Sequence, residues 1–189
     1  MTTQLSLEQM MQTTGALLEG HFLLSSGRHS DRFIQKFRIL EDPALLAPIA
    51  REIADHFAAP SPTIVVSAAV GGILLGYEVA RCLGVRAIFV EKEQGVPRLR
   101  RGFILRPSDR ALVVEDVITT GGSVREVLEV VRASGAAIVG VGAIVRRGEA
   151  ALGVPAFALL DLPLQSYDPL ECPQCAAGEP LVDPGSRRA

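Results

Sequence analysis

The sequence predicts an α/β protein with a mostly parallel central sheet flanked by helices, and two observations carry that prediction. Short apolar runs rich in β-branched residues recur along the chain, with 63–68 and 111–117 the clearest. Segments of roughly 10–14 residues with helical spacing separate them. Because strands alternating with helices form βαβ units, whose parallel strands are covered on both faces, we expect such a core between about residues 60 and 162.

Before the core, the sequence predicts a helix over Ser6–Gly20 and then a hairpin around the Ser26-Gly27 turn. Asp42 and Pro43 predict the start of the next helix, with aspartate as N-cap and proline in the first turn. The tail over 163–189 is rich in proline and glycine. We expect residues 1–40 and 163–189 to form a small hood lobe over the carboxyl edge of the sheet, where such folds bind ligands.

Within the core, strands and helices alternate in order along the chain. The expected strands are 63–68, 87–92, 111–117, 137–145 and 157–162. Helices are expected over 73–84 and 124–135, where apolar residues keep helical spacing. The polar, arginine-rich stretch 93–102 is expected to be a loop.

Composition excludes several classes of protein. The chain has 189 residues, 48% hydrophobic and 21% charged, with a net charge of −2. No apolar run approaches the ~18 residues of a transmembrane helix, and the N-terminus lacks the basic and apolar segments of a signal peptide. We therefore expect a cytoplasmic protein without a membrane partner. Without net positive charge or tryptophan, the chain offers no case for binding nucleic acid.

The strongest functional signal is the segment Val113–Ser123, which runs strand, acidic pair, Thr/Gly/Ser loop and helix. The loop Thr119–Ser123 offers hydroxyls and backbone N–H groups, and its glycines allow close approach of an anion. The positive end of the following helix points to the same place, and Ser123 with Glu126 matches a capping box. These features predict a phosphate cradle. It lacks the lysine of a P-loop, which disfavours ATP hydrolysis by that route.

Glu115 and Asp116 precede the cradle directly. Two carboxylates beside a phosphate would repel it unless they have another task. Accepting hydrogen bonds from a ribose diol is one such task, and holding a metal ion through water is another.

The cysteines suggest less. Cys172 and Cys175 form a CxxC, which supplies two ligands where a closed zinc site needs four. The histidines His21, His29 and His56 lie far away in the sequence. We therefore expect a simple turn or a redox pair rather than an intramolecular zinc site.

The Val113–Ser123 segment resembles the phosphoribosyl-diphosphate (PRPP) signature of type I phosphoribosyltransferases. The resemblance implies that family's fold. It also implies that Glu115 and Asp116 hold the ribose hydroxyls, with Asp116 also assigned to catalysis. The implied cradle of the 5′-phosphate consists of Thr119, Thr120, Gly121, Gly122 and Ser123.

Within that group the chain most resembles the orotate phosphoribosyltransferases, on Phe22–Phe33, on Ser67–Gly72 at the pyrophosphate-loop position and on Val145–Glu149. The resemblance implies transfer of the phosphoribosyl group of PRPP to orotate, in pyrimidine biosynthesis. Gly71 and Gly72 would then contact PRPP, which would carry most of the Mg²⁺ coordination. A homodimer is also implied, with the loop 91–103 covering the neighbouring site.

The chain departs from the family pattern in its lysines. Ser25 and Gly71 stand where family members carry lysine, and Lys92 is the loop's only lysine. We expect Lys92 and the arginines Arg98, Arg100 and Arg101 to clamp the pyrophosphate, because guanidinium groups bind phosphate well. The alternative is a solvated surface loop.

For orotate, the expected contacts are Arg147, Thr119, Ser25 and Phe33, with Arg28 a weaker candidate. A planar guanidinium suits a planar carboxylate. Two other functions stay open at this point: a purine phosphoribosyltransferase, and a regulatory protein that senses PRPP without catalysis.

Overall fold

The computed structural model describes residues 6–24 and 26–184. The chain forms two compact units. The first comprises Met1–Arg38 and Pro163–Ala189, and the second comprises Ile39–Leu162. The short helix α2 (Phe37–Leu40) contains the point where the first unit passes into the second.

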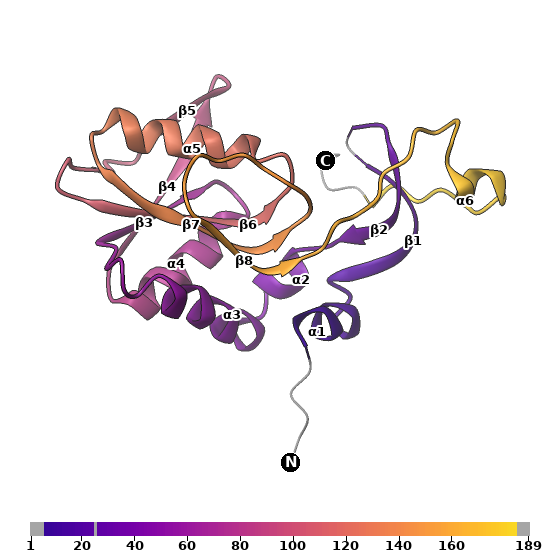
Figure 1. The fold of residues 1–189 in the computed structure, drawn as a ribbon, viewed down its shortest axis with the longest axis horizontal. Helices are drawn as coiled ribbons and strands as arrows, with labels where there is room; N and C mark the ends of the chain where they lie inside the picture. Colours follow the sequence, from indigo (N-terminus) through magenta and orange to yellow (C-terminus); the bar gives the residue numbers. More distant parts are fainter. Residues whose placement is uncertain (1–5, 25, 185–189) are drawn as a thin grey trace, which may run out of the picture. The chain divides into compact units, whose positions relative to one another are not determined.

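The second unit is built on a six-stranded sheet in the order β5-β4-β3-β6-β7-β8 (Figure 1). All neighbouring pairs are parallel except β4 and β5, so the predicted fold class is confirmed. The strands are β3 (Ile64–Ala68), β4 (Arg86–Glu93), β5 (Val96–Leu99), β6 (Arg110–Ile118), β7 (Ala137–Arg146) and β8 (Ala156–Asp161).

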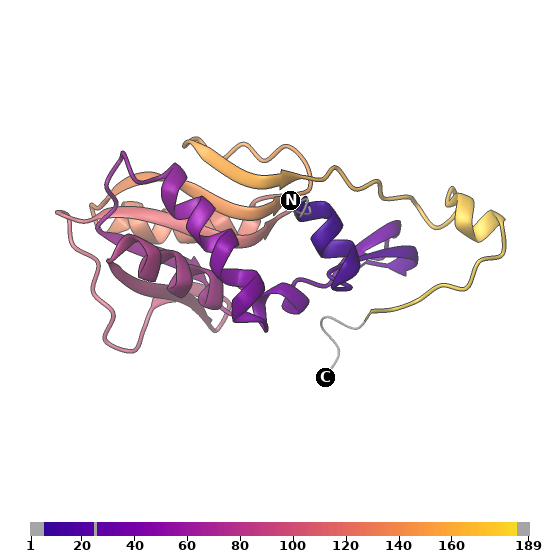
Figure 2. The ribbon, with the colours of Figure 1, turned by 90° about the horizontal axis from the view of Figure 1, so that it is seen from below.

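Helices cover both faces of this sheet. Figure 1 shows α5 (Gly122–Ala133) on one face and α3 (Pro43–His56) with α4 (Gly72–Leu83) on the other, and Figure 2 shows α3 and α4 side by side. Asp42 caps α3 as predicted, its Oδ1 accepting a hydrogen bond from the Ala44 N–H at 2.8 Å. None of the described helices has the length and apolar character needed to cross a membrane.

The predicted arginine-rich loop is instead a β-hairpin. β4 pairs with β5 in antiparallel register, with Glu93 opposite Val96. The two residues between the strands, Gln94 and Gly95, have φ of 51° and 82°. Positive φ at both central residues is what a tight two-residue hairpin turn requires. The loop prediction was wrong because Gln-Gly is a weaker turn signal than Asn-Gly or Asp-Gly.

The predicted capping box of α5 is also wrong. The N-cap is Gly121, in the left-handed conformation with φ 77°, and it makes no side-chain cap bond. Ser123 therefore lies inside the first turn of α5 rather than at its cap. Glu126 instead pairs with Lys92 across the structure.

The first unit contains α1 (Leu7–Thr13) and the antiparallel strands β1 (Leu17–Leu23) and β2 (His29–Ile34), which confirm the predicted hairpin. The predicted helix to Gly20 was wrong. Gly15 has φ 71° and follows the C-cap Thr14, so the chain leaves the helix there and enters β1. The tail adds the four-residue α6 (Pro173–Ala176).

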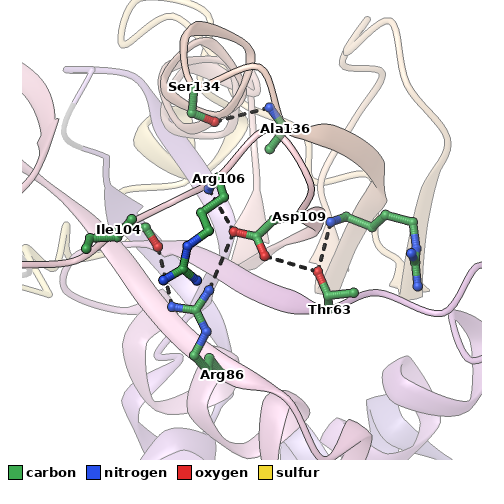
Figure 3. A network of polar contacts seen from close by, with 8 residues as sticks. Thr63, Arg86, Ile104, Arg106, Asp109, Ser134 and Ala136 are labelled. Carbon is green, nitrogen blue, oxygen red and sulfur yellow. Dashed lines mark hydrogen bonds and ion pairs between the residues drawn. The ribbon is translucent and has the colours of Figure 1, made fainter.

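A buried carboxylate organises the amino edge of the large sheet (Figure 3). Asp109 is 8% exposed, and its Oδ2 accepts a hydrogen bond from the Arg106 N–H at 2.8 Å. Its other oxygen accepts a hydrogen bond from Thr63 at 3.4 Å, and Arg86 Nη2 lies 3.5 Å from Oδ2. This network joins the chain before β6 to the starts of β3 and β4, at the edge opposite the predicted cradle.

Candidate active site

The carboxyl ends of β3, β4, β6 and β7 meet at one edge of the sheet, because these strands are parallel. Four predicted site segments therefore gather there. They are the turn 69–71 after β3, Lys92 at the end of β4, the loop 119–121 after β6 and Arg147 after β7. This edge is the usual ligand site of open α/β sheets.

The predicted phosphate cradle lies in the loop from β6 to α5. Thr119, Thr120, Gly122 and Ser123 are exposed, so their polar groups are accessible to a ligand. Arg125 Nη2 donates to the Thr120 carbonyl at 2.8 Å. That bond ties the loop to the first turn of α5.

Gly121 has a structural task in this loop that the sequence did not indicate. Besides its φ of +77°, a Cβ there would meet Leu152 Cδ2 at 2.9 Å and Ala150 Cβ at 3.1 Å. At Gly122 a Cβ would meet only Thr120 Oγ1, at 3.7 Å. Gly121 is therefore required by the fold itself, whereas Gly122 leaves open space in front of the cradle.

The acidic pair is more buried than an exposed strand end would be. Glu115 is 7% exposed and Asp116 is 1% exposed. Glu115 Oε1 accepts a hydrogen bond from the Asp116 N–H at 3.0 Å, and Asp116 Oδ1 accepts one from the Val117 N–H at 2.6 Å. One oxygen of each carboxylate is thus held by the backbone, which fixes both side chains beside the cradle.

The turn after β3 packs tightly against the sheet. A Cβ on Gly72 would lie 3.2 Å from the Val114 carbonyl oxygen and 3.5 Å from Glu115 Oε1. Gly71 and Gly72 are both buried, and the peptide bond between Ala69 and Val70 is cis. Close helix-to-sheet packing therefore accounts for Gly72, while PRPP contact by Gly71 and Gly72 stays a prediction.

A pocket of about 340 Å³ lies between this turn, β4 and α5. Its lining includes Val70, Lys92, Ser123 and Glu126. Lys92 Nζ lies 2.8 Å from Glu126 Oε1. The structure thus brings Lys92 to the first turns of the cradle helix and pairs it with Glu126, which the sequence pattern had assigned to a capping box.

The three arginines of the hairpin also have carboxylate partners. Arg101 Nη2 lies 3.1 Å from Glu91 Oε2, and Arg100 Nη2 lies 3.3 Å from Glu93 Oε1. Arg98 Nε lies 3.9 Å from Glu93 Oε2. These side chains are largely exposed, so their ion pairs are weak and can be exchanged for a ligand's phosphate oxygens.

The two consecutive arginines at the carboxyl end of β7 differ in their surroundings. Arg146 is paired with Asp161, whereas Arg147 Nε is buried and has no hydrogen-bond partner within the described part of the chain. Burial lowers the pKa of the Arg147 guanidinium from its usual value. The Arg147 N–H donates to the Ile118 carbonyl at 2.9 Å, which places its backbone beside the start of the cradle loop.

Three of the predicted orotate contacts fall in the other unit. Phe33 lies against Phe22, with ring centroids 5.7 Å apart. Arg28 donates to the Ser166 carbonyl at 2.6 Å and to its hydroxyl at 3.0 Å. Ser25 lies outside the described residues.

Comparison with known proteins shows which family has this sequence and fold. The model of the family "Phosphoribosyl transferase domain" matches residues 38–156. The orotate phosphoribosyltransferase of Pelotomaculum thermopropionicum is 52% identical over 181 residues, which cover 95% of each chain.

Solved structures agree. The crystal structure of orotate phosphoribosyltransferase from Aeropyrum pernix has a TM-score of 0.66 at 29% identity, covering 81% of this chain and 92% of that one. An adenine phosphoribosyltransferase from Rhodothermus marinus has a TM-score of 0.58 at 24% identity, covering 69% of this chain and 87% of that one. The second likeness shows a shared fold alone.

Proposed function

The chain belongs to the phosphoribosyl transferase family, among the orotate phosphoribosyltransferases, and from that premise we propose how its residues perform the reaction. The activity is orotate phosphoribosyltransferase activity, in pyrimidine biosynthesis. The bond from ribose C1 to pyrophosphate breaks, a bond from C1 to the orotate ring nitrogen forms, and that nitrogen loses its proton. The products are orotidine 5′-monophosphate and pyrophosphate.

The observation that carries the proposal is the position of Arg147 beside the cradle. Its guanidinium is half-buried, its Nε has no hydrogen-bond partner within the described residues, and its backbone is bonded to Ile118. A half-buried cation with no carboxylate partner in the described part of the chain favours an anionic ligand. Orotate differs from uracil by one carboxylate, and the fork of Arg147 can bind a carboxylate through two parallel hydrogen bonds.

The cradle binds the 5′-phosphate in this proposal. Thr119, Thr120 and Ser123 present hydroxyls, and Gly122 begins α5, whose positive end favours an anion. Glu115 and Asp116 accept hydrogen bonds from the ribose hydroxyls. Their backbone hydrogen bonds pre-organise them, so their side chains lose little conformational entropy on binding.

The donor set at this edge fits Mg²⁺. Glu115 and Asp116 supply hard carboxylate oxygens, which Mg²⁺ prefers, and Mg²⁺ commonly keeps several waters and binds through substrate phosphates. When bound with PRPP, Mg²⁺ would neutralise charge on the leaving pyrophosphate. The two carboxylates would orient it through water.

The cations of β4, of β5 and of the residues just after β5 are proposed to clamp the pyrophosphate. Lys92 lines the pocket beside Ser123 and must exchange Glu126 for a phosphate oxygen. Arg98, Arg100 and Arg101 must likewise exchange Glu91 and Glu93. Interactions that form as the leaving group develops charge stabilise the transition state rather than the bound substrate.

A homodimer is proposed from the exposed surface of α4. Val70, Leu74 and Tyr77 are 73%, 49% and 66% exposed, and their spacing places them on one face of the turn and helix. Exposed apolar stripes of this kind mark interaction surfaces. Because Val70 also lines the pocket, a second copy of the chain on this stripe would lie next to the site.

The dimer is tested by light scattering of Leu74→Asp, which we expect to be monomeric and less active. Leu170→Asp is the matched control, because Leu170 is 96% exposed and lies in the other unit. A wild-type monomer with full activity would contradict the proposal.

The reaction itself is tested by offering PRPP and Mg²⁺ with orotate, uracil, adenine or hypoxanthine and separating the nucleotide products by chromatography. We expect orotidine 5′-monophosphate and no other nucleotide. Preferred use of a purine would overturn the orotate assignment while leaving the PRPP site intact. PRPP binding without any product would indicate a regulatory protein.

A further inference from the structure

Four metal-ligating side chains that are far apart in the sequence lie together in the first unit. They are His21, His29, Cys172 and Cys175, and one ligand atom of each lies within 4.8 Å of all the others. We propose that these four residues form a structural Zn²⁺ site. In the sequence, the histidines are distant from the cysteines, which disfavoured a zinc site; the fold brings all four residues together.

The hairpin and the tail bring the four residues together. His21 lies in β1 and His29 begins β2. Cys172 is the N-cap of α6 and Cys175 lies within it. The tail is joined to the hairpin by backbone hydrogen bonds, since Val182 pairs with His21 and Tyr167 pairs with His29.

The distances suit tetrahedral zinc. His21 Nε2 lies 3.5 Å from Cys172 Sγ and 3.6 Å from Cys175 Sγ, and His29 Nδ1 lies 3.3 Å from Cys175 Sγ. With Zn–N of about 2.0–2.1 Å and Zn–S of about 2.3 Å, tetrahedral ligand atoms lie roughly 3.3–3.8 Å apart. The two histidine nitrogens, at 2.9 Å, need to separate by only a few tenths of an ångström.

The tautomer of His21 is the one that a ligand needs. His21 Nδ1 lies 3.0 Å from the Glu179 carbonyl oxygen, which can only accept a hydrogen bond. Nδ1 therefore carries the proton, and in the neutral ring the lone pair of Nε2 faces the cluster. A second ring nitrogen that donates to a backbone carbonyl is the common support of a metal-bound histidine.

The composition of the cluster indicates a structural site and this particular metal. Two thiolates and two imidazoles in a tetrahedral arrangement are typical of Zn²⁺. All four positions are supplied by the protein, so no position is left for a substrate. His21, His29 and Cys172 are buried, as expected for a closed site, and only Cys175 is exposed. A redox pair of the two cysteines would leave both histidines unexplained.

A metal ion that links the hairpin to the tail would stabilise the first unit. Its sheet has only two strands, and an isolated two-stranded sheet is marginally stable. A metal ion here would join residues of the hairpin to residues about 150 positions later. Because the site does not exist in the unfolded chain, the free energy of metal binding would add to the free energy of folding. The bound ion would hold the tail on β1 and β2.

Metal content and spectroscopy of the full chain test the proposal. We expect about one zinc ion per chain by elemental analysis after purification without added chelator. The chain reloaded with Co²⁺ should show the intense visible bands of tetrahedral cobalt and a thiolate-to-metal charge-transfer band. Neither measurement requires a variant to fold. A zinc-free chain whose mass shows a Cys172–Cys175 disulfide would overturn the proposal.

Matched variants locate the site. We expect the zinc content per chain of His29→Ala and of Cys172→Ser to be at most one tenth of the wild-type value. His56→Gln and Cys82→Ser should retain it fully, because this remaining histidine and cysteine lie in the second unit. Cys175→His should keep the metal, since it replaces one ligand by another, whereas Cys175→Ser should lose it. Equal zinc content in all six variants would place the metal elsewhere and contradict the assignment.

Removal and return of the metal test its structural role. Dialysis of the wild-type chain against a strong chelator should lower the melting temperature and expose the tail to protease, and added Zn²⁺ should reverse both effects. An unchanged melting temperature and digestion pattern would show that the ion does not support the fold.

Discussion

Arg146 and Asp161 form a bidentate ion pair at the ends of β7 and β8. Arg146 Nε lies 2.6 Å from Asp161 Oδ1, and Nη2 lies 2.8 Å from Oδ2. Hydrogen bonds from the Arg146 guanidinium lower the pKa of the Asp161 carboxyl from its usual value. One of the two adjacent arginines is thus committed to a protein carboxylate, which leaves Arg147 as the one available to a ligand.

The first prediction follows from that division. Arg147→Ala should lower kcat/KM for orotate about 30-fold or more, which corresponds to about 2 kcal/mol of lost transition-state stabilisation, the scale for losing a charged hydrogen bond. Arg146→Ala should change kcat/KM little, because the Arg146 guanidinium is bonded to Asp161 and is not assigned to orotate. Steady-state kinetics at varied orotate concentration measure both. Equal losses in the two variants would contradict the role given to Arg147.

The second prediction concerns the pair Lys92 and Glu126. If Lys92 leaves Glu126 to bind pyrophosphate, Lys92→Ala should lower kcat on the order of 10²-fold, as loss of one preorganised donor does. Glu126→Gln should tighten PRPP binding, because the competing carboxylate charge is gone. Kinetics and titration calorimetry report the two effects.

Lys36→Ala is the control for this second prediction, because Lys36 is the only other lysine and lies in the first unit. It should leave kcat unchanged. If Glu126→Gln lowers kcat as much as Lys92→Ala does, the ion pair itself is the required element and the exchange does not occur.

The third prediction separates two neighbouring glycines. Gly121→Ala should destabilise the fold by about 1–2 kcal/mol for the left-handed conformation, and by more because of its crowded surroundings. Gly122→Ala should leave the melting temperature unchanged, since a Cβ has space there, and should weaken PRPP binding by projecting a methyl group at the cradle. Calorimetry and PRPP titration distinguish them. Wild-type PRPP affinity in Gly122→Ala would remove Gly122 from the site.

The fourth prediction tests the amino edge. Asp109→Ala should lower the free energy of unfolding by about 1–3 kcal/mol, because the Arg106 N–H and the Thr63 hydroxyl lose their acceptor. The kcat should stay near wild type, since the active-site loops lie at the opposite edge. Asp55→Ala is the control, because the Asp55 side chain is 68% exposed and should be nearly neutral. Denaturant unfolding of both variants gives the comparison.

Much of the core was determined by local sequence. The β-branched runs 63–68 and 111–117 became buried strands. Their side chains are apolar on both faces of the strand, and both faces are removed from water only between two layers of helix. Asp42 capped α3 because an aspartate followed by proline suits that position in almost any context. The order strand, loop, helix around Thr119–Ser123 is likewise a local property and is confirmed, whereas phosphate binding by this loop stays a prediction.

Local patterns misled where a competing signal decided the outcome. Apolar spacing extended the first predicted helix to Gly20, yet Gly15 ended it because its positive φ reverses the chain. Ser123 and Glu126 matched a capping motif, yet the Glu126 carboxylate forms an ion pair with Lys92, which lies 34 residues away in the sequence.

Only the tertiary structure decided which distant side chains meet. Sequence spacing cannot show that a two-strand hairpin and the tail bring His21 and His29 beside Cys172 and Cys175, because that contact depends on pairing between segments about 150 residues apart. It also cannot show that Asp161 occupies Arg146 and leaves Arg147 available. Local propensity selects helices and strands, whereas partners across the fold are selected by packing and by the burial of charge.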